Sequence, residues 1–440
     1  MKKSLLPLVA VLSVSAASAQ SSVTLFGVLD ASISHYKVGS ATSSTISPTT
    51  GQPVFSATSE RRQTVLGNGN SVSSRLGFRG TEDLGGGLAA GFWLEAPLSN
   101  DDGSIVRPPN FTRRSTVSLI GGFGEIRLGR DYVPSFYNDS IFDPFQTNGV
   151  GTNIINQTSG VNRSNRTVLT ADPNYNRAPN SVGYFLPPVL GGVYGQAMYS
   201  FNENVQTDAP LPNGLPFNTS SQRGRYVGGR VGYAKGPFDV ALAYGQSTLG
   251  NFGGTVTAPF AAANFANAYD ANIKTANFGI GYDFDVVKIT AELSQVKTSF
   301  GQPVFTNPLT GAVTRLPVSE SANSKGFLVG AQVPIGPHVI KFAYSRVATG
   351  LPDSTTVVTV GAARVPLATD TPDPTVSKIA LGYVYNLSKR TALYATVAKI
   401  DNKNGSAIAG FNGNNNSATP ITGSPNSHNF GYDLGLRHAF

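Results

Sequence analysis

The residues of this chain with the most informative spacing are arginines that alternate with apolar residues. In SRLGFRG, Arg75 and Arg79 flank an apolar–glycine–apolar triplet, and in GEIRLGR, Arg127 stands between two apolar residues. Alternation with a period of two places the arginines on one face of a β-strand and the apolar residues on the other. A guanidinium is always charged and offers only hydrogen-bond donors, so a row of arginines can bind and orient anions.

Residue patterns that would indicate catalysis or metal binding are missing. The four histidines are scattered without an HExxH spacing, no G-x-S-x-G nucleophile motif occurs, and there is no cysteine. GGFGEIRLG resembles a dinucleotide loop, but Arg127 stands where the last glycine would be. Although the formal net charge is +8, the basic residues are dispersed, which argues against a nucleic-acid surface. We therefore expect no enzyme, cofactor, metal or nucleic-acid partner; a catalytic site assembled in space is the alternative.

The first nineteen residues are typical of a secretory signal peptide. A basic start, Met1-Lys2-Lys3, precedes a short apolar stretch and the A-x-A cleavage site Ala17-Ser18-Ala19. We expect residues 1–19 to be removed and residues 20–440, beginning at Gln20, to form one domain; a buried N-terminal helix is the alternative. No later stretch approaches the about 20 consecutive apolar residues of a transmembrane helix.

Segments with the alternation of half-apolar strands follow one another to the end of the chain. Sixteen are expected, beginning near Val23, Val72, Leu88, Arg113, Gly124, Asn180, Val193, Tyr226, Phe238, Asn277, Val287, Gly326, His338, Lys378, Thr391 and Asn429. Seven connections are short, such as GGF and VPIGP. Eight are long and polar, at about 37–71, 96–112, 131–179, 202–225, 245–276, 297–325, 348–377 and 401–428. Short and long connections alternate strictly.

This rhythm predicts an all-β fold, a 16-stranded antiparallel transmembrane β-barrel with short turns at one end and long loops at the other. In hydrocarbon every backbone N–H and C=O needs an internal partner, so a spanning sheet must close on itself. Its apolar face then points to lipid, and its polar face lines water. A secreted soluble all-β protein is the alternative, but it would not need the alternating loop lengths.

Several segments closely resemble the general porins of β-proteobacteria, of the Neisseria, Bordetella and Burkholderia type. They are SSVTLFGVLD, SRLGFRGTEDLGGGLAAGFWLE, RRSTVSLIGGFGEIRLGRDYVPSFYND, NSVGYFLPPVLGGVYGQAMYSF, KIALGYVYNLSKRTALYATVAKIDN and NFGYDLGLRHAF. The resemblance covers the whole mature chain. It implies a homotrimer in the outer membrane, passive diffusion of ions and small hydrophilic solutes, and a third loop folded into each lumen. The chain departs from the family in its long third loop, in Trp93 on the lumen parity, and in Ala439 at a position that is often basic.

A diffusion pore depends on charges across a narrow lumen. Between the neighbours Arg113 and Arg114, parity favours Arg114 and the resemblance favours Arg113. Arg130 has outward parity, but the family's LGR motif implies that it reaches the lumen. The expected basic wall is therefore Arg75, Arg79, Arg113, Arg114, Arg127 and Arg130. The resemblance implies that acidic residues of the third loop, Asp131, Asp139 and Asp143, face this wall; capping of local turns is the alternative for them. The basic excess suggests a weak anion preference.

The last strand is expected to have a second role, in insertion into the membrane. An aromatic C-terminal residue with alternating apolar positions before it resembles the outer-membrane insertion signal, read by the assembly machinery. Its members are Tyr432, Leu434, Leu436, His438 and Phe440. The leading hypothesis for function is a general diffusion porin. The alternatives are a substrate-preferring porin, or a barrel occluded by its third loop that acts in surface contact or adhesion.

Overall fold

The computed structural model describes residues 22–39, 42–46, 53–57, 60–103, 110–156, 172, 174–203, 224–249, 271–300, 304–306, 313–315, 322–350, 354–360, 363–369, 372–411 and 424–440. The predicted signal peptide, residues 1–19, lies outside them. Within this part of the chain, the search for helices long and apolar enough to cross a membrane finds none.

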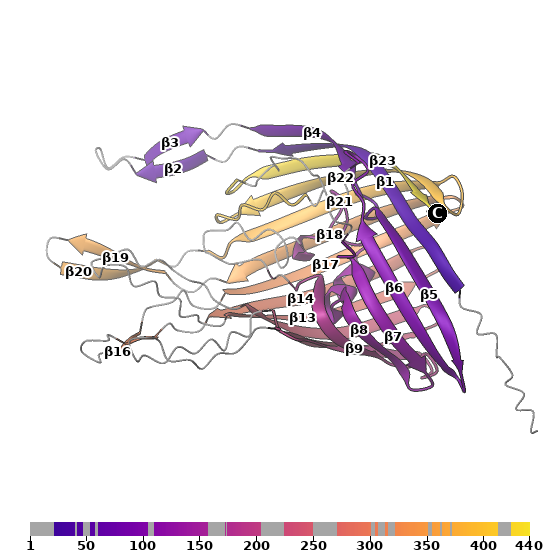
Figure 1. The fold of residues 1–440 in the computed structure, drawn as a ribbon. Helices are drawn as coiled ribbons and strands as arrows, with labels where there is room; N and C mark the ends of the chain where they lie inside the picture. Colours follow the sequence, from indigo (N-terminus) through magenta and orange to yellow (C-terminus); the bar gives the residue numbers. More distant parts are fainter. Residues whose placement is uncertain are drawn as a thin grey trace, which may run out of the picture.

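One closed sheet dominates the molecule (Figure 1). Its strands in the first half are β1 (Ser22–Val38), β4 (Arg61–Asn68), β5 (Arg75–Gly85), β6 (Leu88–Pro97), β7 (Arg114–Gly121), β8 (Gly124–Tyr132), β9 (Arg177–Phe185), β10 (Val193–Ser200) and β11 (Tyr226–Lys235). The second half holds β12 (Phe238–Leu249), β13 (Ala271–Asp283), β14 (Lys288–Phe300), β17 (Ala322–Ile335), β18 (His338–Gly350), β21 (Thr375–Asn386), β22 (Thr391–Lys403) and β23 (His428–Ala439). Each strand pairs antiparallel with its neighbours.

These seventeen segments form sixteen barrel strands, because β4 and β5 follow each other along the same side of β1. Both pair with β1, β4 along Ala31–Val38 and β5 along Ser22–Val28. The predicted sixteen-stranded antiparallel barrel is confirmed. The predicted start of the second strand, near Val72, is wrong. Residues 61–68, which were expected in the first long loop, form β4, and Val72 lies in the break that separates β4 from β5. The carboxylate of Asp30 causes the break by accepting hydrogen bonds from the backbone N–H groups of Ser71 (2.8 Å) and Val72 (2.6 Å).

The barrel closes between the two ends of the chain. Val28–Val38 of β1 pair with Asn429–Ala439 of β23, so no edge of the sheet is left unpaired. Large apolar side chains point away from the interior, for example Val117, Leu242 and Leu293, which are 54%, 55% and 61% exposed. Polar side chains such as Ser32 and Thr290 are buried inside. This is the reverse of a soluble protein and fits a wall between lipid and water.

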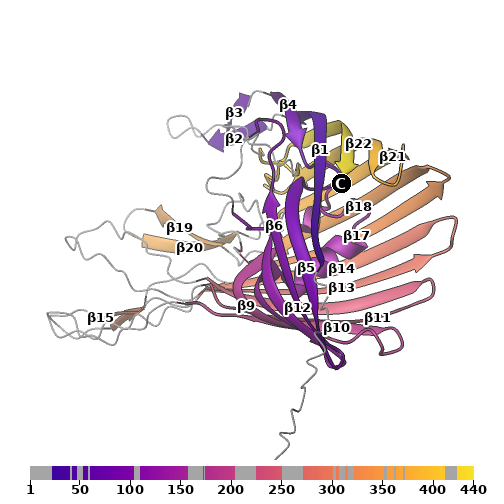
Figure 2. The same cartoon turned by 45° about the vertical axis from the view of Figure 1, so that its right-hand side comes forward.

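The two ends of the barrel differ as the connection lengths predicted. Short turns join strands at the end where the C-terminus lies, and small hairpins project beyond the other end (Figures 1 and 2). The hairpins are β2 (Thr42–Ile46) with β3 (Pro53–Ala57), β15 (Val304–Thr306) with β16 (Val313–Arg315), and β19 (Ser354–Val360) with β20 (Ala363–Thr369). We refer to these as the short-turn end and the long-loop end.

The third long connection folds into the barrel and carries two helices, α1 (Pro134–Phe142) and α2 (Ile154–Asn156). Its apolar residues rest on inward-facing glycines of the wall. A Cβ on Gly279 would lie 2.0 Å from the Phe142 ring, and one on Gly382 would lie 2.6 Å from the ring of Phe145. Real Cβ atoms do not approach so closely, so glycine makes room for the loop. Because Phe142, Phe145 and Ile155 are also buried, the loop packs firmly against the wall from β13 to β21.

Candidate functional site

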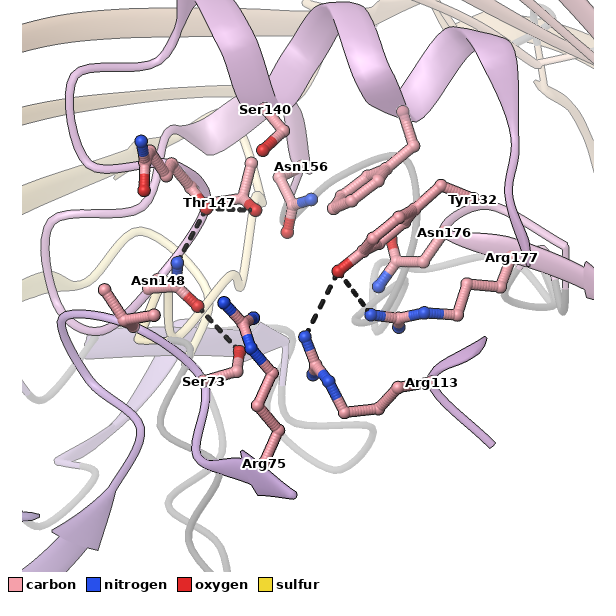
Figure 3. A pocket seen from close by; sticks show the side chains of 13 residues that line it. Ser73, Arg75, Arg113, Tyr132, Ser140, Thr147, Asn148, Asn156, Asn176 and Arg177 are labelled. Carbon is pink, nitrogen blue, oxygen red and sulfur yellow. Dashed lines mark hydrogen bonds between the residues drawn. The ribbon is translucent and has the colours of Figure 1, made fainter. Parts of the chain in front are cut away.

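Three guanidinium groups meet around one phenol inside the barrel (Figure 3). Arg113 donates to the Tyr132 hydroxyl at 3.2 Å, and Arg177 donates to the same oxygen. The side chain of Arg75 lies beside them on the same cavity of about 280 Å³. We call Arg75, Arg113 and Arg177 the arginine triad.

A single carboxylate partly balances the triad. Glu95 Oε1 accepts from Arg113 Nε at 2.6 Å and lies 3.9 Å from Arg75 Nε. Arg177 forms no ion pair within the described residues, and its buried Nε has no hydrogen-bond partner there. The guanidinium instead stacks 4.1 Å from the centre of the Tyr132 ring. Three cations against one anion leave the cavity positively charged.

Local structure explains how the triad converges. Arg75 is the first residue of β5, directly after the break that Asp30 holds open. Arg113 precedes β7 and its backbone N–H bonds to the Glu95 carbonyl at 3.1 Å. Arg177 begins β9, where the register with β8 shifts and Asn180 has a positive φ of 53°. The break before β5, the irregular pairing of β9 and the position just before β7 thus bring three long side chains to the same part of the lumen.

The third loop forms the other side of this cavity and offers neutral groups. Ser140, Asn148 and Asn156 line it. The Asn148 side chain also accepts a hydrogen bond from Ser73 Oγ at 3.0 Å, which ties the loop to the break between β4 and β5. The arginine wall therefore faces hydroxyls and amides here.

A second charged cavity, of about 360 Å³, lies nearer the short-turn end of the same wall. Arg79, Arg114 and Arg127 line it. The Arg79 and Arg114 guanidiniums lie 5.2 and 4.5 Å from the centre of the Trp93 ring, which faces the lumen as its parity predicted. Asp131 pairs with Arg127 and lies 3.7 Å from Arg114.

Glu125 completes this second cavity. Its Oε2 lies 2.8 Å from the Nη2 of Arg127. Three arginines there face two carboxylates, so this second group is closer to neutral than the triad.

The remaining predicted site residues are not brought to these cavities. Arg130 keeps its outward parity, and its Nε donates to the Thr112 carbonyl at 2.6 Å. Asp139 and Asp143 are completely buried between the third loop and the wall, and neither contacts an arginine among the described residues. Asp143 accepts backbone N–H bonds from the loop itself, such as that of Phe145 at 2.9 Å, which is the turn-capping alternative.

Asp139 is held by other loop residues. It accepts from Tyr175 Oη at 2.6 Å and from Asn153 Nδ2 at 2.7 Å. Burial, together with the neighbouring carboxylate of Asp143, raises the pKa of Asp139 to about 6, although these hydrogen bonds oppose the shift. Burial raises the pKa of Asp143 as well. These aspartates anchor the loop and do not present charge to the lumen.

Three residues of the site were not among those singled out from the sequence. Glu95 alternates with outward Phe92 and Leu94, so parity alone could have placed it inward. Arg177 lay within the predicted third loop. Tyr132 lay at the start of that loop, where no strand alternation could predict the direction of its side chain. Their placement depends on the irregular pairing of β8 with β9.

The predicted insertion signal lies on the outer face of β23. Leu434, Leu436 and Phe440 are 52%, 47% and 40% exposed, and Tyr432 and His438 share their parity. The backbone of Phe440 exchanges two hydrogen bonds with Gly27, of 3.0 and 3.1 Å. The last residue thus completes the closing pair of strands. Among the described residues, no group of three or more His, Asp or Glu is placed to hold a metal ion.

Comparisons with known proteins agree with a pore lined in this way. A family model described as Gram-negative porin matches residues 8–405. The chain belongs to the Gram-negative porin family. An outer membrane porin protein 32 of Delftia acidovorans is 33% identical over the full length of both chains. An outer membrane porin protein of Bordetella pertussis is 29% identical over 86% of this chain and 89% of its own.

Among solved structures, this porin resembles an anion-selective porin from Comamonas acidovorans. The TM-score is 0.66 at 29% identity, with 96% of this chain and all of the other covered. The barrel is therefore an outer-membrane channel for the passive diffusion of ions and small hydrophilic solutes, and the predicted family, location and general function are confirmed. Membership of this family favours a channel over an enzyme.

Proposed function

We propose that the porin prefers anions and that the arginine triad is its selective constriction. The observation that carries this proposal is the imbalance of charge, since three guanidiniums face the one carboxylate of Glu95 and the neutral groups of the third loop. Rings of positive charge across a pore favour anions, and low-dielectric walls strengthen their field. The solved structure from Comamonas acidovorans bears the description anion-selective, which supports the same preference.

In this proposal the second cavity extends the path of the anion. Arg79 makes no ion pair within the described part of the chain and is stacked on aromatic rings, so its donors remain available to a passing anion. Arg114 and Arg127 share their charge with Asp131 and Glu125. Anions would meet strong attraction at the triad and weaker attraction beyond it, so that binding would not prevent release.

The experiment that tests this proposal is the zero-current potential of single channels in a planar bilayer under a salt gradient. We expect a potential of the sign that anion flux produces, and a shift toward cations in R75Q/R113Q/R177Q. The matched control is Arg346→Gln, which removes a positive charge from the outer face of β18. Equal selectivity in the triple variant and the control would contradict the proposed constriction, and a silent bilayer with folded protein would favour an occluded barrel.

We also propose a homotrimer, and recognition of Tyr432, Leu434, Leu436, His438 and Phe440 by the outer-membrane assembly machinery. The resemblance to general porins and the exposed apolar wall support both. Channel closures in groups of three would support the trimer, whereas closures that are always single would contradict it.

A further inference from the structure

Four apolar side chains point into the lumen from the arginine wall, between β1 and β9. Each is next in sequence to a large hydrophobic residue that is exposed on the outer face, so strand alternation turns it inward. They are Phe26 of β1, Trp93 of β6, Ile120 of β7 and Phe185 of β9, and all four are half-buried. The lumen of such barrels is polar and filled with water, so an apolar surface there is stabilised when a solute covers it.

Phe26 and Trp93 form a ring pair between the arginine triad and the second cavity. Their ring centres lie 4.9 Å apart, with the planes tilted by 60°. Phe26 covers Gly77, where an added Cβ would lie 2.3 Å from the ring, so only glycine leaves room for it. On the inward row of β5, Gly77 separates Arg75 of the triad from Arg79 of the second cavity. An anion that moves from one group of arginines to the other therefore passes the ring pair.

Arg79 lies against these rings and not against a carboxylate. Its guanidinium is 5.4 Å from the centre of the Phe26 ring and 5.2 Å from that of Trp93. Arg79 is exposed to the lumen and makes no ion pair with any residue that the structure describes. A guanidinium that rests on a ring still presents its N–H donors at its edge. A carboxylate bound at that edge would lie next to the rings, so that its attached group can contact them.

The second cavity, beside the ring pair, has space for a small molecule. Its volume is about 360 Å³, and Trp93 and Ile120 line it together with Arg79. Gly91, two residues before Trp93 on the inward row of β6, keeps the wall open, since an added Cβ there would meet no atom closer than 3.5 Å. The indole is fixed in place because its Nε1 donates to Glu95 Oε2 at 3.1 Å. The cavity thus combines a cation that has no acidic partner with a rigid apolar surface.

We propose that the second cavity binds carboxylates that carry an aromatic ring, in preference to carboxylates without one. The carboxylate would accept hydrogen bonds from Arg79, and the ring would pack against Trp93 and Ile120 above Gly91. Aromatic pairs gain stability beyond the burial of their area. The two other arginines of the cavity are already paired with acidic residues, which leaves the charge of the solute to Arg79. This inference rests on the proposed anion path and names a class of anion that the path would take.

The test compares benzoate with acetate, a carboxylate without a ring, and with benzyl alcohol, a ring without a charge. Because Trp93 is the single tryptophan of the chain, its fluorescence in the detergent-solubilised porin reports binding at this cavity. The first variant is R79Q, with R346Q on the outer face of β18 as its matched control. For Trp93→Gln and Trp93→Phe, the measurement is the concentration of each probe that halves the chloride current of single channels. Heat-modifiable mobility in detergent gels verifies that each variant is folded.

We expect benzoate to bind about fivefold more tightly than acetate, and benzyl alcohol to bind weakly. Benzoate should bind more weakly to R79Q than to R346Q. Its advantage over acetate should disappear in Trp93→Gln and persist in Trp93→Phe, which keeps a ring but loses the hydrogen bond to Glu95.

Equal binding of benzoate and acetate to the native porin would overturn the inference, and so would an advantage of benzoate that survives in Trp93→Gln. Benzyl alcohol that binds as tightly as benzoate would overturn it too, because the site would then not recognise the carboxylate. The zero-current potential tests the anion preference separately. A channel without anion preference that still binds benzoate in this way would therefore refute the proposed constriction and not the aromatic site.

Discussion

Replacing Glu95 by glutamine should increase the anion preference of the pore. Glutamine keeps the shape of the side chain and removes the one negative charge that faces the arginine triad. A charge about 6 Å from the path of a monovalent ion changes its energy by about 0.7 kcal/mol in water, and by about half of that with screening at 0.1 M salt. Anions gain and cations lose this energy, so the permeability ratio should rise about three- to tenfold.

The zero-current potential under a salt gradient measures this ratio directly, and repeating it in 1 M salt should reduce the effect because screening shortens the range of the charge. Glu95→Asp is the control, since it keeps the charge while its shorter side chain draws the carboxylate away from Arg113. A permeability ratio that stays constant in Glu95→Gln, or moves toward cations, would refute the assignment of this carboxylate to the constriction.

Three further predictions concern the loop and the terminus. Gly279→Ala should displace the third loop, because the new Cβ would meet the Phe142 ring at 2.0 Å, and single-channel conductance should change; Gly281→Ala, where the nearest atom is 3.5 Å away, should leave conductance unaltered. Because the pKa of Asp139 is raised from 3.8 to about 6, its protonated form stabilises loop docking below about pH 4, and this stabilisation is lost as the pH rises through 6. Current fluctuations should therefore increase from pH 4 to 7 more in the native porin than in Asp139→Asn, which keeps only the buried carboxyl of Asp143 in the loop; an equal increase in both would contradict the role of Asp139. Phe440→Ser should reduce the yield of heat-modifiable barrel in outer membranes several-fold, and an undiminished yield would count against the insertion signal.

The alternation of side chains made most of the wall predictable. Parity assigned Arg75, Arg79 and Arg127 to the lumen because the two-residue period of a strand depends only on local backbone geometry. The strand starts that differ, such as Ala271 where Asn277 was expected, lie where strands extend beyond the alternating segment. Such extensions are stabilised by pairing with a neighbour, which a single strand's pattern does not contain.

The constriction was less predictable because loops and bulges break the period. The position of Arg177 depends on the shifted pairing of β8 and β9. That of Arg75 depends on the hydrogen bonds that Asp30 accepts from the neighbouring break between β4 and β5. Asp139 and Asp143 are acidic residues near an arginine wall in sequence, but the loop turns them toward the opposite wall. The role of the six predicted arginines and three predicted aspartates in ion selection therefore remains a prediction.

The pairing of β1 with β23 has a consequence for how the chain reaches its final state. The two strands that complete the sheet are the first and the last barrel strands in the sequence, so their contacts join residues that are far apart along the chain. Such contacts form slowly because a long loop must close first. Until then the growing sheet has two bare edges that can pair with other chains. Escape from aggregation therefore depends on a late event, the arrival of the final strand beside the first.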